Sequence, residues 1–418
     1  MINSPKMSSP NDIILDLDLG DTKPMEKPLD GRPNIAILLG AGFSAPMGYP
    51  IGKTVNDYLS KFDFDKYDIS PAGELYEREI PETVFYTQYQ RNLRFCKCII
   101  DKYIVLHNGL FDYEEFFDFI HSQDIFATPY KDCANDLIAR NEDYKEFVDG
   151  LDNIFSQMIE RVVKDRNGKI WYDDEPSSAT FPEEYASFLR ILNKWNNDYI
   201  IDIHTLNHDL LFESFNKIGE LAVRVSDGFE EYGSNYYGDL SAYERKYTVR
   251  LEHYSKKYSS ALRLYKLHGS LDYILYYKSD GIAMIPGTCI KRRFGVGLMS
   301  LKRDDPRERR YEHYPFAYHS YFLTGVHNKI AQYSHPFYKE LHEKFHTNLK
   351  TAEKMIVIGY GGKDKGINDA ILQNYDYKRK PTIIIDLKPS EQLIKFAKKL
   401  DAQIITKSVS DIREEDLR

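Results

Sequence analysis

The sequence alternates between short apolar runs that end in glycine or polar residues and longer segments with apolar residues at helical spacing. The run Ile35–Leu39 is followed at once by Gly40-Ala41-Gly42. A short apolar run that glycine closes is typical of a buried parallel strand. Comparable runs lie at 198–203, 264–267, 354–358, 382–386 and 403–406, with helical patterns before or after them. This alternation predicts an α/β protein with a Rossmann-like, doubly wound parallel sheet.

A long segment without strand-like runs separates the first predicted strand from the second. Its apolar residues recur at helical spacing at 85–107, 112–121, 145–163 and 183–195. We therefore predict a large helical insertion after the first strand, at about 60–195.

Three further expectations concern the organisation of the chain. The first 32 residues are rich in Pro, Asp, Ser and Lys and are expected to form a flexible tail ahead of a domain at 33–418. A short strand is expected at 221–225, before a polar, tyrosine-rich excursion at 230–254. A small subregion is expected at about 272–350.

Composition narrows the function classes. The chain has 418 residues, of which 42% are hydrophobic and 29% charged, and its net charge is −8. No apolar stretch approaches the roughly 20 residues that cross a bilayer, and the N-terminus lacks a secretory signal. We expect a cytoplasmic protein without membrane or direct sequence-specific nucleic-acid binding, in which the basic run at 291–293 is a solvated face.

The cysteine pattern bears on metal and redox chemistry. Only four cysteines are present, and Cys96-x-Cys98 has the wrong spacing for a zinc ribbon. So few cysteines in so long a chain indicate that no disulfide framework is needed, and we expect no zinc and no other metal site.

Several predicted strands end in polar clusters, at 40–44, 205–209, 268–270, 359–364 and Asp386. Ligands of open parallel sheets bind at the carboxyl ends of the strands, so these clusters are expected to converge on one crevice. Gly40-x-Gly42-x-x-Ala45 fits a strand–turn–helix fingerprint whose backbone amides suit a pyrophosphate. A glycine turn that serves only the fold is the alternative for this stretch alone.

The ordered motifs GAGFSAPMGYP, TLNHD, LHGS and GYGGKD resemble those of the sirtuins. Among these, the chain resembles most the short, sirtuin-like NAD-hydrolysing effectors of bacterial antiphage defence. The resemblance covers about 34–386. It implies Asn207 and His268 as the catalytic pair, with Asp209 in support. The candidate cofactor contacts, in these motifs and at the end of a later strand, are Gly40, Ala41, Gly42, Phe43, Ser44, Pro50, Gly359, Tyr360, Gly361, Asp364 and Asp386.

The chemistry of these side chains agrees with that implication. Cleavage of a nicotinamide–ribose bond requires a held pyrophosphate, an oriented ribose and a placed water. Asn207 has both donors and an acceptor for hydroxyl and water, and a neutral His268 is a suitable general base. Asp386 is placed to accept from the adenosine ribose. The alternatives are that His268 is a turn histidine and that Asn207 and Asp209 only cap a helix, as we expect Asp209 to do in any case.

Some features depart from the deacylases of the sirtuin family. The chain has Ile51-Gly52-Lys53 where they have Asp-Phe-Arg, lacks their four-cysteine zinc module, and has His208 where they have Ile or Val. The expected function is therefore an NAD(+) glycohydrolase that depletes NAD in abortive infection. A protein deacylase and a non-catalytic sensor of NAD or ADP-ribose remain the alternatives. Effectors of this kind act beside a HerA-like hexameric ATPase or an Argonaute-type nucleic-acid sensor, and the resemblance implies a homo-oligomer for which we expect the ATPase as partner. A self-contained oligomer that a phage protein triggers is the alternative.

Overall fold

The computed structural model describes most of the chain. The described residues are 31–70, 74–77, 88–135, 144–168, 182–242, 245–279, 284–293, 295–297, 300–303, 313–315, 320 and 336–418. The predicted tail, apart from 31–32, lies outside the described residues.

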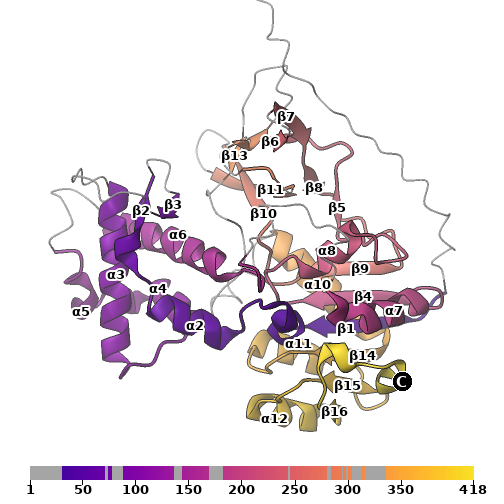
Figure 1. Cartoon of the computed structure of the whole chain (residues 1–418). Coiled ribbons are helices and arrows are strands. Elements are labelled where there is room, and N and C mark those ends of the chain that lie inside the picture. Colours follow the sequence, from indigo (N-terminus) through magenta and orange to yellow (C-terminus); the bar gives the residue numbers. More distant parts are fainter. Residues whose placement is uncertain are drawn as a thin grey trace, which may run out of the picture.

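A six-stranded sheet forms the centre of the molecule (Figure 1). Its order is β16-β15-β14-β1-β4-β9, and every neighbouring pair is parallel. The strands are β1 (Asn34–Leu39), β4 (Ile200–Thr205), β9 (Leu262–Lys266), β14 (Ala352–Ile358), β15 (Thr382–Ile385) and β16 (Gln403–Ile405). Counted along the chain, this is the 3-2-1-4-5-6 order of the Rossmann fold, which reverses between β1 and β14.

Helices cover both faces of this sheet because alternate strand residues point to opposite sides. Ile35, Ile37 and Leu39 pack with α7 (Ala186–Trp195) and α8 (Leu211–Lys217). Ala36 and Leu38 pack on the other face, with α10 (Pro336–Thr351), α11 (Lys365–Asn374) and α12 (Glu391–Leu400). The predicted doubly wound α/β fold is confirmed.

The segment between β1 and β4 is largely helical, as predicted. Figure 1 shows these helices as a bundle at one side of the sheet. They are α2 (Gly52–Ser60), α3 (Gln88–Leu106), α4 (Tyr113–Ile120), α5 (Thr128–Lys131) and α6 (Tyr144–Val162), with a two-stranded sheet of β2 (Tyr67–Ile69) and β3 (Leu75–Glu77). The short helix α1 (Ala41–Ser44) instead packs its Phe43 in the core beside the central sheet. Aromatic side chains such as Phe95, Phe116 and Phe155 fill their common core. In the segment after Asp112, Phe116 and Phe117 thus serve as core packing residues.

The bundle contains one disulfide, which the cysteine count did not predict. Cys98 of α3 is bonded to Cys133, which follows α5, whereas Cys96 and Cys289 are buried free thiols. The sequence spacing gave no sign of this bond, because the two cysteines are 35 residues apart and meet only when α3 and α5 pack.

Two antiparallel sheets lie beyond β4. A five-stranded sheet has the order β13-β10-β11-β8-β5, and a three-stranded sheet the order β12-β6-β7. Their strands are β5 (Phe229–Glu230), β6 (Tyr236–Ala242), β7 (Arg245–Arg250), β8 (Glu252–Tyr254), β10 (Tyr273–Ser279), β11 (Met284–Lys291), β12 (Lys302–Arg303) and β13 (His313–Pro315). The small subregion was expected at about 272–350, but the strands of these two sheets begin before residue 272. The helix α10, which lies within those bounds, packs on the central sheet.

Two local expectations in this region were wrong. Residues 221–225 form no strand; a single bridge joins Ser226 to Arg263 instead. The basic run is not a solvated face: Arg292 is buried, and Lys291 is paired with Asp227 and lies 4.0 Å from Asp272. These two carboxylates, on neighbouring loops, balance the charge of the largely buried Lys291 side chain.

One-turn 3₁₀ helices complete the described chain: Ala45–Met47, Phe64–Lys66, Gln123–Phe126, Glu183–Tyr185, Val409–Asp411 and Glu414–Leu417. Among the helices described, none has the length and apolar character needed to cross a membrane.

Candidate active site

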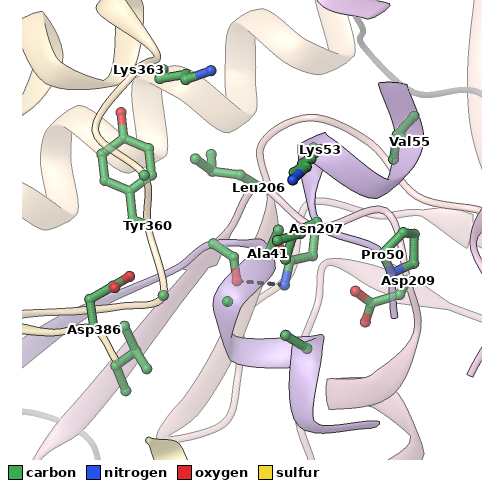
Figure 2. Close-up of a pocket in the computed structure, with 18 of the residues that line it drawn as sticks. Ala41, Pro50, Lys53, Val55, Leu206, Asn207, Asp209, Tyr360, Lys363 and Asp386 are labelled. Atoms are coloured by element: carbon green, nitrogen blue, oxygen red, sulfur yellow. Dashed lines mark hydrogen bonds between the residues drawn. The ribbon is translucent and has the colours of Figure 1, made fainter. Parts of the chain in front are cut away.

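A cavity of about 900 Å³ opens at the carboxyl edge of the central sheet. It lies where the strand order reverses, between the turns that follow β1 and β14, which is the usual ligand site of such sheets. The predicted convergence of the strand ends is observed there. The predicted residues that line the cavity are Gly40, Ala41, Gly42, Pro50, Asn207, Asp209, His268, Gly359, Tyr360, Gly361, Asp364 and Asp386 (Figure 2).

The two glycine turns at the floor of the cavity are packed backbone to backbone. The Gly42 amide donates to the Gly359 carbonyl oxygen at 2.9 Å, and the Gly40 amide donates to Ile358 at 3.0 Å. Gly359 has φ +64°, and a Cβ there would lie 2.3 Å from the Phe43 nitrogen. Glycine is therefore required at 359 both by conformation and by space.

Because of this packing, fewer backbone amides of the turn can bind a pyrophosphate than the sequence predicted. The amides of Gly40 and Gly42 are bonded across to the β14 turn, and the Phe43 amide donates to the Gly40 carbonyl oxygen. These three donors are already used, so they are not available to a phosphate. The helix that follows, α1, is a single turn rather than the longer helix that the fingerprint predicts.

Asn207 is fixed against the first glycine turn. Its Nδ2 donates to the Gly40 carbonyl oxygen and to Ser44 Oγ, both at 3.0 Å, and its backbone amide donates to Thr205 Oγ1. The side chain is buried. Because both amide hydrogens are used, the Oδ1 atom is the one that suits a substrate hydroxyl or a water.

Asp209 binds the start of the following helix, as we expected, but from one residue ahead of the N-cap position, which is Leu210. Its Oδ1 accepts from the Leu211 amide at 3.0 Å, at the start of α8. Burial raises the pKa of this carboxyl, and the nearby Lys266 ammonium opposes the shift. Lys266 is itself buried; it donates to the Asp209 carbonyl oxygen and lies 3.0 Å from Glu213. The loop that carries Asn207 and Asp209 is thereby tied to the end of β9.

His268 follows β9 and faces Asp364. The imidazole Nε2 lies 3.1 Å from Asp364 Oδ2. A second histidine, His342 of α10, is buried nearby, and its pKa is lowered to about 3, first by burial and then by the charge of His268. The Asp364 carboxylate also acts on His342, but its effect is smaller than that of burial, so His342 is neutral.

The loop after β14 is fixed by side-chain hydrogen bonds, within the loop, to α11 and to the N-cap residue of α12. Tyr360 Oη donates to the Asp364 carbonyl oxygen at 3.1 Å and to Asn368 Oδ1 at 2.9 Å. Ser390 Oγ donates to the Gly361 carbonyl oxygen at 2.7 Å. Next to it, Asp386 accepts from the Lys388 amide, and partial burial raises its pKa.

Two of the predicted contacts do not line the cavity. The Phe43 ring lies in the core against Tyr185 and Phe188, with ring centroids 5.1 and 5.4 Å away. Ser44 is buried and accepts from Asn207. Both side chains support the turn from behind.

The helical insertion supplies a wall that sequence reasoning missed. Asn56 of α2, with Asp112, Tyr113 and Glu114 at the start of α4, lines the cavity opposite the sheet. Asn56 Oδ1 accepts from the Tyr113 amide at 2.8 Å, which joins the two helices. No motif marks these residues, because only tertiary packing brings them to the sheet.

Lysines are the other class of lining residue that the prediction omitted. Lys53, Lys363, Lys388 and Lys407 all lie at the cavity. Lys363 sits inside the quoted GYGGKD motif and Lys53 just beyond Pro50, so the sequence did hold a signal for these two. Their charges suit an anionic ligand.

No set of three or more His, Cys, Asp or Glu side chains that could bind a metal ion occurs among the described residues. The arrangement therefore offers an imidazole beside a carboxylate, an amide oxygen, buried carboxyls and surrounding lysines. These groups suit base-assisted attack of water on an anionic substrate.

Comparison with known proteins gives a distant structural likeness. No protein-family model matches the sequence, and no curated protein matches it. The chain is similar to solved structures of Sir2 proteins. A Sir2 homologue in complex with NAD is 11% identical, with a TM-score of 0.37 and coverage of 93% of this chain and 89% of that one. A Sir2 protein bound to an acetylated peptide is 10% identical, with a TM-score of 0.32 and coverage of 92% and 91%. Similarity at this level carries no information about activity.

Proposed function

We propose that this protein is an NAD(+) glycohydrolase that cleaves the nicotinamide–ribose bond. The observation that carries the proposal is the meeting of Asn207 and His268 in one cavity, beside the glycine turns at the reversal of strand order. We choose NAD(+) as the substrate because the sequence resembles sirtuin-like NAD-hydrolysing effectors.

The roles of the residues follow from their contacts. Asn207 Oδ1 orients a ribose hydroxyl or the water, because its amide hydrogens already bind Gly40 and Ser44. His268 takes a proton from the water as its oxygen bonds to the ribose carbon. The C–N bond breaks, neutral nicotinamide leaves with the electron pair, and the proton passes from His268 to solvent. The products are ADP-ribose, nicotinamide and a proton.

The lysines and Asp386 have binding roles in this proposal. Lys53, Lys363 and Lys388 place positive charges at the cavity, beside its carboxylates, and these three are the candidate partners of the pyrophosphate. Lys407 also lines the cavity but is ion-paired with Asp416 at 2.7 Å. Asp386 accepts from the adenosine ribose, as its place after β15 allows.

The test measures nicotinamide release from NAD(+) by the purified chain, with and without an acetylated peptide. Release that does not depend on the peptide supports the proposal. Release that requires the peptide would indicate a deacylase instead. Binding of NAD(+) or ADP-ribose without release, also in the presence of the product of the neighbouring gene, would indicate a sensor.

The wider role that we propose is NAD depletion in abortive infection, by a homo-oligomer that acts with a HerA-like ATPase. It rests on the sequence resemblance and on the need to restrain such an activity in the cell. Exposed apolar side chains of the insertion are a candidate contact surface: Val105 and Leu110 are each 74% exposed and Leu106 is 50% exposed. Light scattering and co-purification with the neighbouring gene product test this role. A monomer that is fully active alone would contradict it.

A further inference from the structure

Asp364 and His268 form a close pair at the cavity although nearly a hundred residues separate them in the chain. His268 Nε2 lies 3.1 Å from Asp364 Oδ2, and the two side chains are only 5% and 14% exposed. His268 comes from the turn after β9, and Asp364 from the start of α11. The pair therefore joins the strand ends on either side of the cavity.

The two oxygens of Asp364 have different partners. Oδ1 accepts from the Ile367 amide at 3.0 Å and so caps α11. Oδ2 is the atom that faces His268. The backbone of Asp364 is also fixed, because Tyr360 Oη donates to its carbonyl oxygen. The position of the Asp364 carboxylate is thus fixed by hydrogen bonds within the protein and does not depend on a ligand.

We propose that Asp364 is the positioning residue of the His268 base, rather than a contact to the nucleotide as the sequence implied. This inference rests on the proposed hydrolysis. A carboxylate at Nε2 keeps the ring proton on that nitrogen, so that the lone pair of the neutral ring is on Nδ1. It also stabilises the imidazolium that forms when Nδ1 takes the proton of the attacking water.

The surroundings of His268 support this assignment. Two further titratable side chains near His268 are His342 of α10 and His208 of the loop after β4, and the ring centroid of His208 is 6.5 Å from that of His268. Burial and the neighbouring imidazole keep His342 neutral, because they lower its pKa to about 3. A neutral imidazole cannot replace the charge of Asp364.

The test is Asp364→Asn, which keeps the size of the side chain and its capacity to cap α11 but removes the charge. We expect kcat for nicotinamide release to fall by about tenfold or more, with KM for NAD(+) almost unchanged. Asp386→Asn, at the proposed ribose contact, should instead raise KM. Asp364→Ser also caps the helix but is too short to reach His268, so it should lose kcat as well. In a His268→Ala background, Asp364→Asn should cost little more, because the pair acts as a unit.

A second measurement is independent of turnover. Titration of the His268 imidazole by NMR, without NAD(+), should give a lower pKa in Asp364→Asn than in the unmodified chain, because the charge that favours the imidazolium is gone. A raised KM at constant kcat, or an unchanged pKa of His268, would overturn the inference. If the unmodified chain releases no nicotinamide, the proposed function fails, and the titration still decides whether the two residues are coupled.

Discussion

The Asn207 side chain donates to the Gly40 carbonyl oxygen at 3.0 Å, which links the loop after β4 to the turn after β1. Asn207→Ala removes this bond, the bond to Ser44 and the Oδ1 acceptor together. We expect nicotinamide release to fall about 10²-fold or more, because the reacting groups lose their alignment. The fold should persist, with a loss of about 1–3 kcal/mol in the free energy of unfolding for the unpaired buried groups.

Asn193→Ala is the matched control for this substitution. Asn193 likewise makes two side-chain hydrogen bonds: its Nδ2 donates to the Glu220 carbonyl oxygen and its Oδ1 accepts from the Ala222 amide. It lies on α7 and does not line the cavity. It should lose stability while nicotinamide release is retained. Near-normal release by Asn207→Ala would refute the role of Asn207, and unfolding of that variant in circular dichroism would show a structural role alone.

The packing of the two glycine turns gives a prediction about stability. At Gly359, a Cβ would lie 2.3 Å from the Phe43 nitrogen, at φ +64°. We expect Gly359→Ala to cost about 1–3 kcal/mol for overpacking and a further ~1–2 kcal/mol for the left-handed conformation. Urea denaturation measures the loss.

Gly361→Ala is the control in the same loop. No heavy atom lies within 4 Å of the Cβ that it would add, and its φ is outside the left-handed region. Its free energy of unfolding should stay close to that of the unmodified chain. Equal losses in the two variants would mean that the contact between the turns does not determine stability.

The sequence was informative where local pattern decides structure. The run at Ile35–Leu39 and the glycines behind it predicted β1 and its turn, because burial on both faces requires a continuous apolar strand. Polar residues after successive strands predicted the cavity, because parallel strands end at one edge. The strand expected at 221–225 failed because this short apolar stretch finds no neighbouring strand along its length.

Contacts between distant segments escaped sequence reasoning. The wall made by Asn56 and Tyr113, the bond between Cys98 and Cys133, and the pair of His268 with Asp364 all depend on how helices and loops pack. The same holds for Lys291, whose burial beside Asp227 could not be inferred from a basic run. Spacing along the chain gives no measure of such distances.

The absence of zinc remains a prediction. Cys96 and Cys289 are buried and apart from each other in sequence, and Cys98 and Cys133 are bonded to one another. Metal analysis of the purified protein should find no stoichiometric zinc, and a chelator should leave the thermal unfolding temperature unchanged. Stoichiometric zinc that is lost together with structure on chelation would contradict this.

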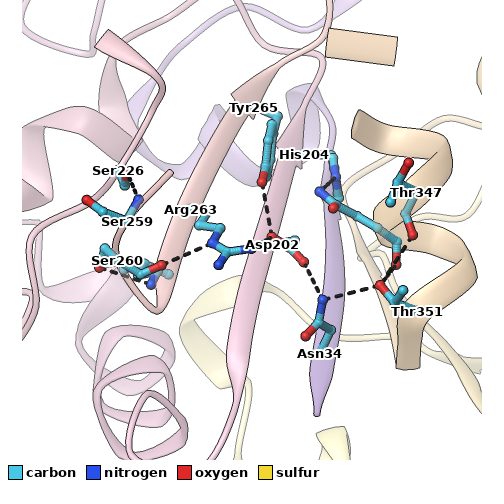
Figure 3. A network of polar contacts seen from close by, with 12 residues as sticks. Asn34, Asp202, His204, Ser226, Ser259, Ser260, Arg263, Tyr265, Thr347 and Thr351 are labelled. Carbon is cyan, nitrogen blue, oxygen red and sulfur yellow. Dashed lines mark hydrogen bonds and ion pairs between the residues drawn. The ribbon is translucent and has the colours of Figure 1, made fainter. Parts of the chain in front are cut away.

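A network of polar contacts lies across the strands and reaches Thr347 and Thr351 of α10, with the buried Asp202 at its centre (Figure 3). Asp202 of β4 is 0% exposed; it accepts from Asn34 Nδ2 at 3.2 Å and from Tyr265 Oη at 3.3 Å, and it lies 3.7 Å from Arg263. Burial raises the pKa of Asp202 to about 6, although Arg263 opposes the shift. Burial therefore raises the pKa of Asp202 by more than Arg263, Tyr265 and Asn34 lower it.

The raised pKa of Asp202 predicts how stability changes with pH. An unfolded aspartate titrates near pH 4, so between about pH 4 and pH 6 the folded state keeps a proton that the unfolded state has released. The contribution of Asp202 to the free energy of unfolding is therefore present below pH 4 and is lost as pH rises through 6. The Asp202→Asn side chain cannot titrate. The free energy of unfolding of this variant, relative to that of the unmodified chain, should therefore rise by roughly 3 kcal/mol from pH 4 to pH 7, at about 1.4 kcal/mol per pKa unit. Urea denaturation of both proteins across this range measures the difference. A difference that is constant with pH, or that changes in the opposite direction, would show that Asp202 is ionised in the folded protein throughout.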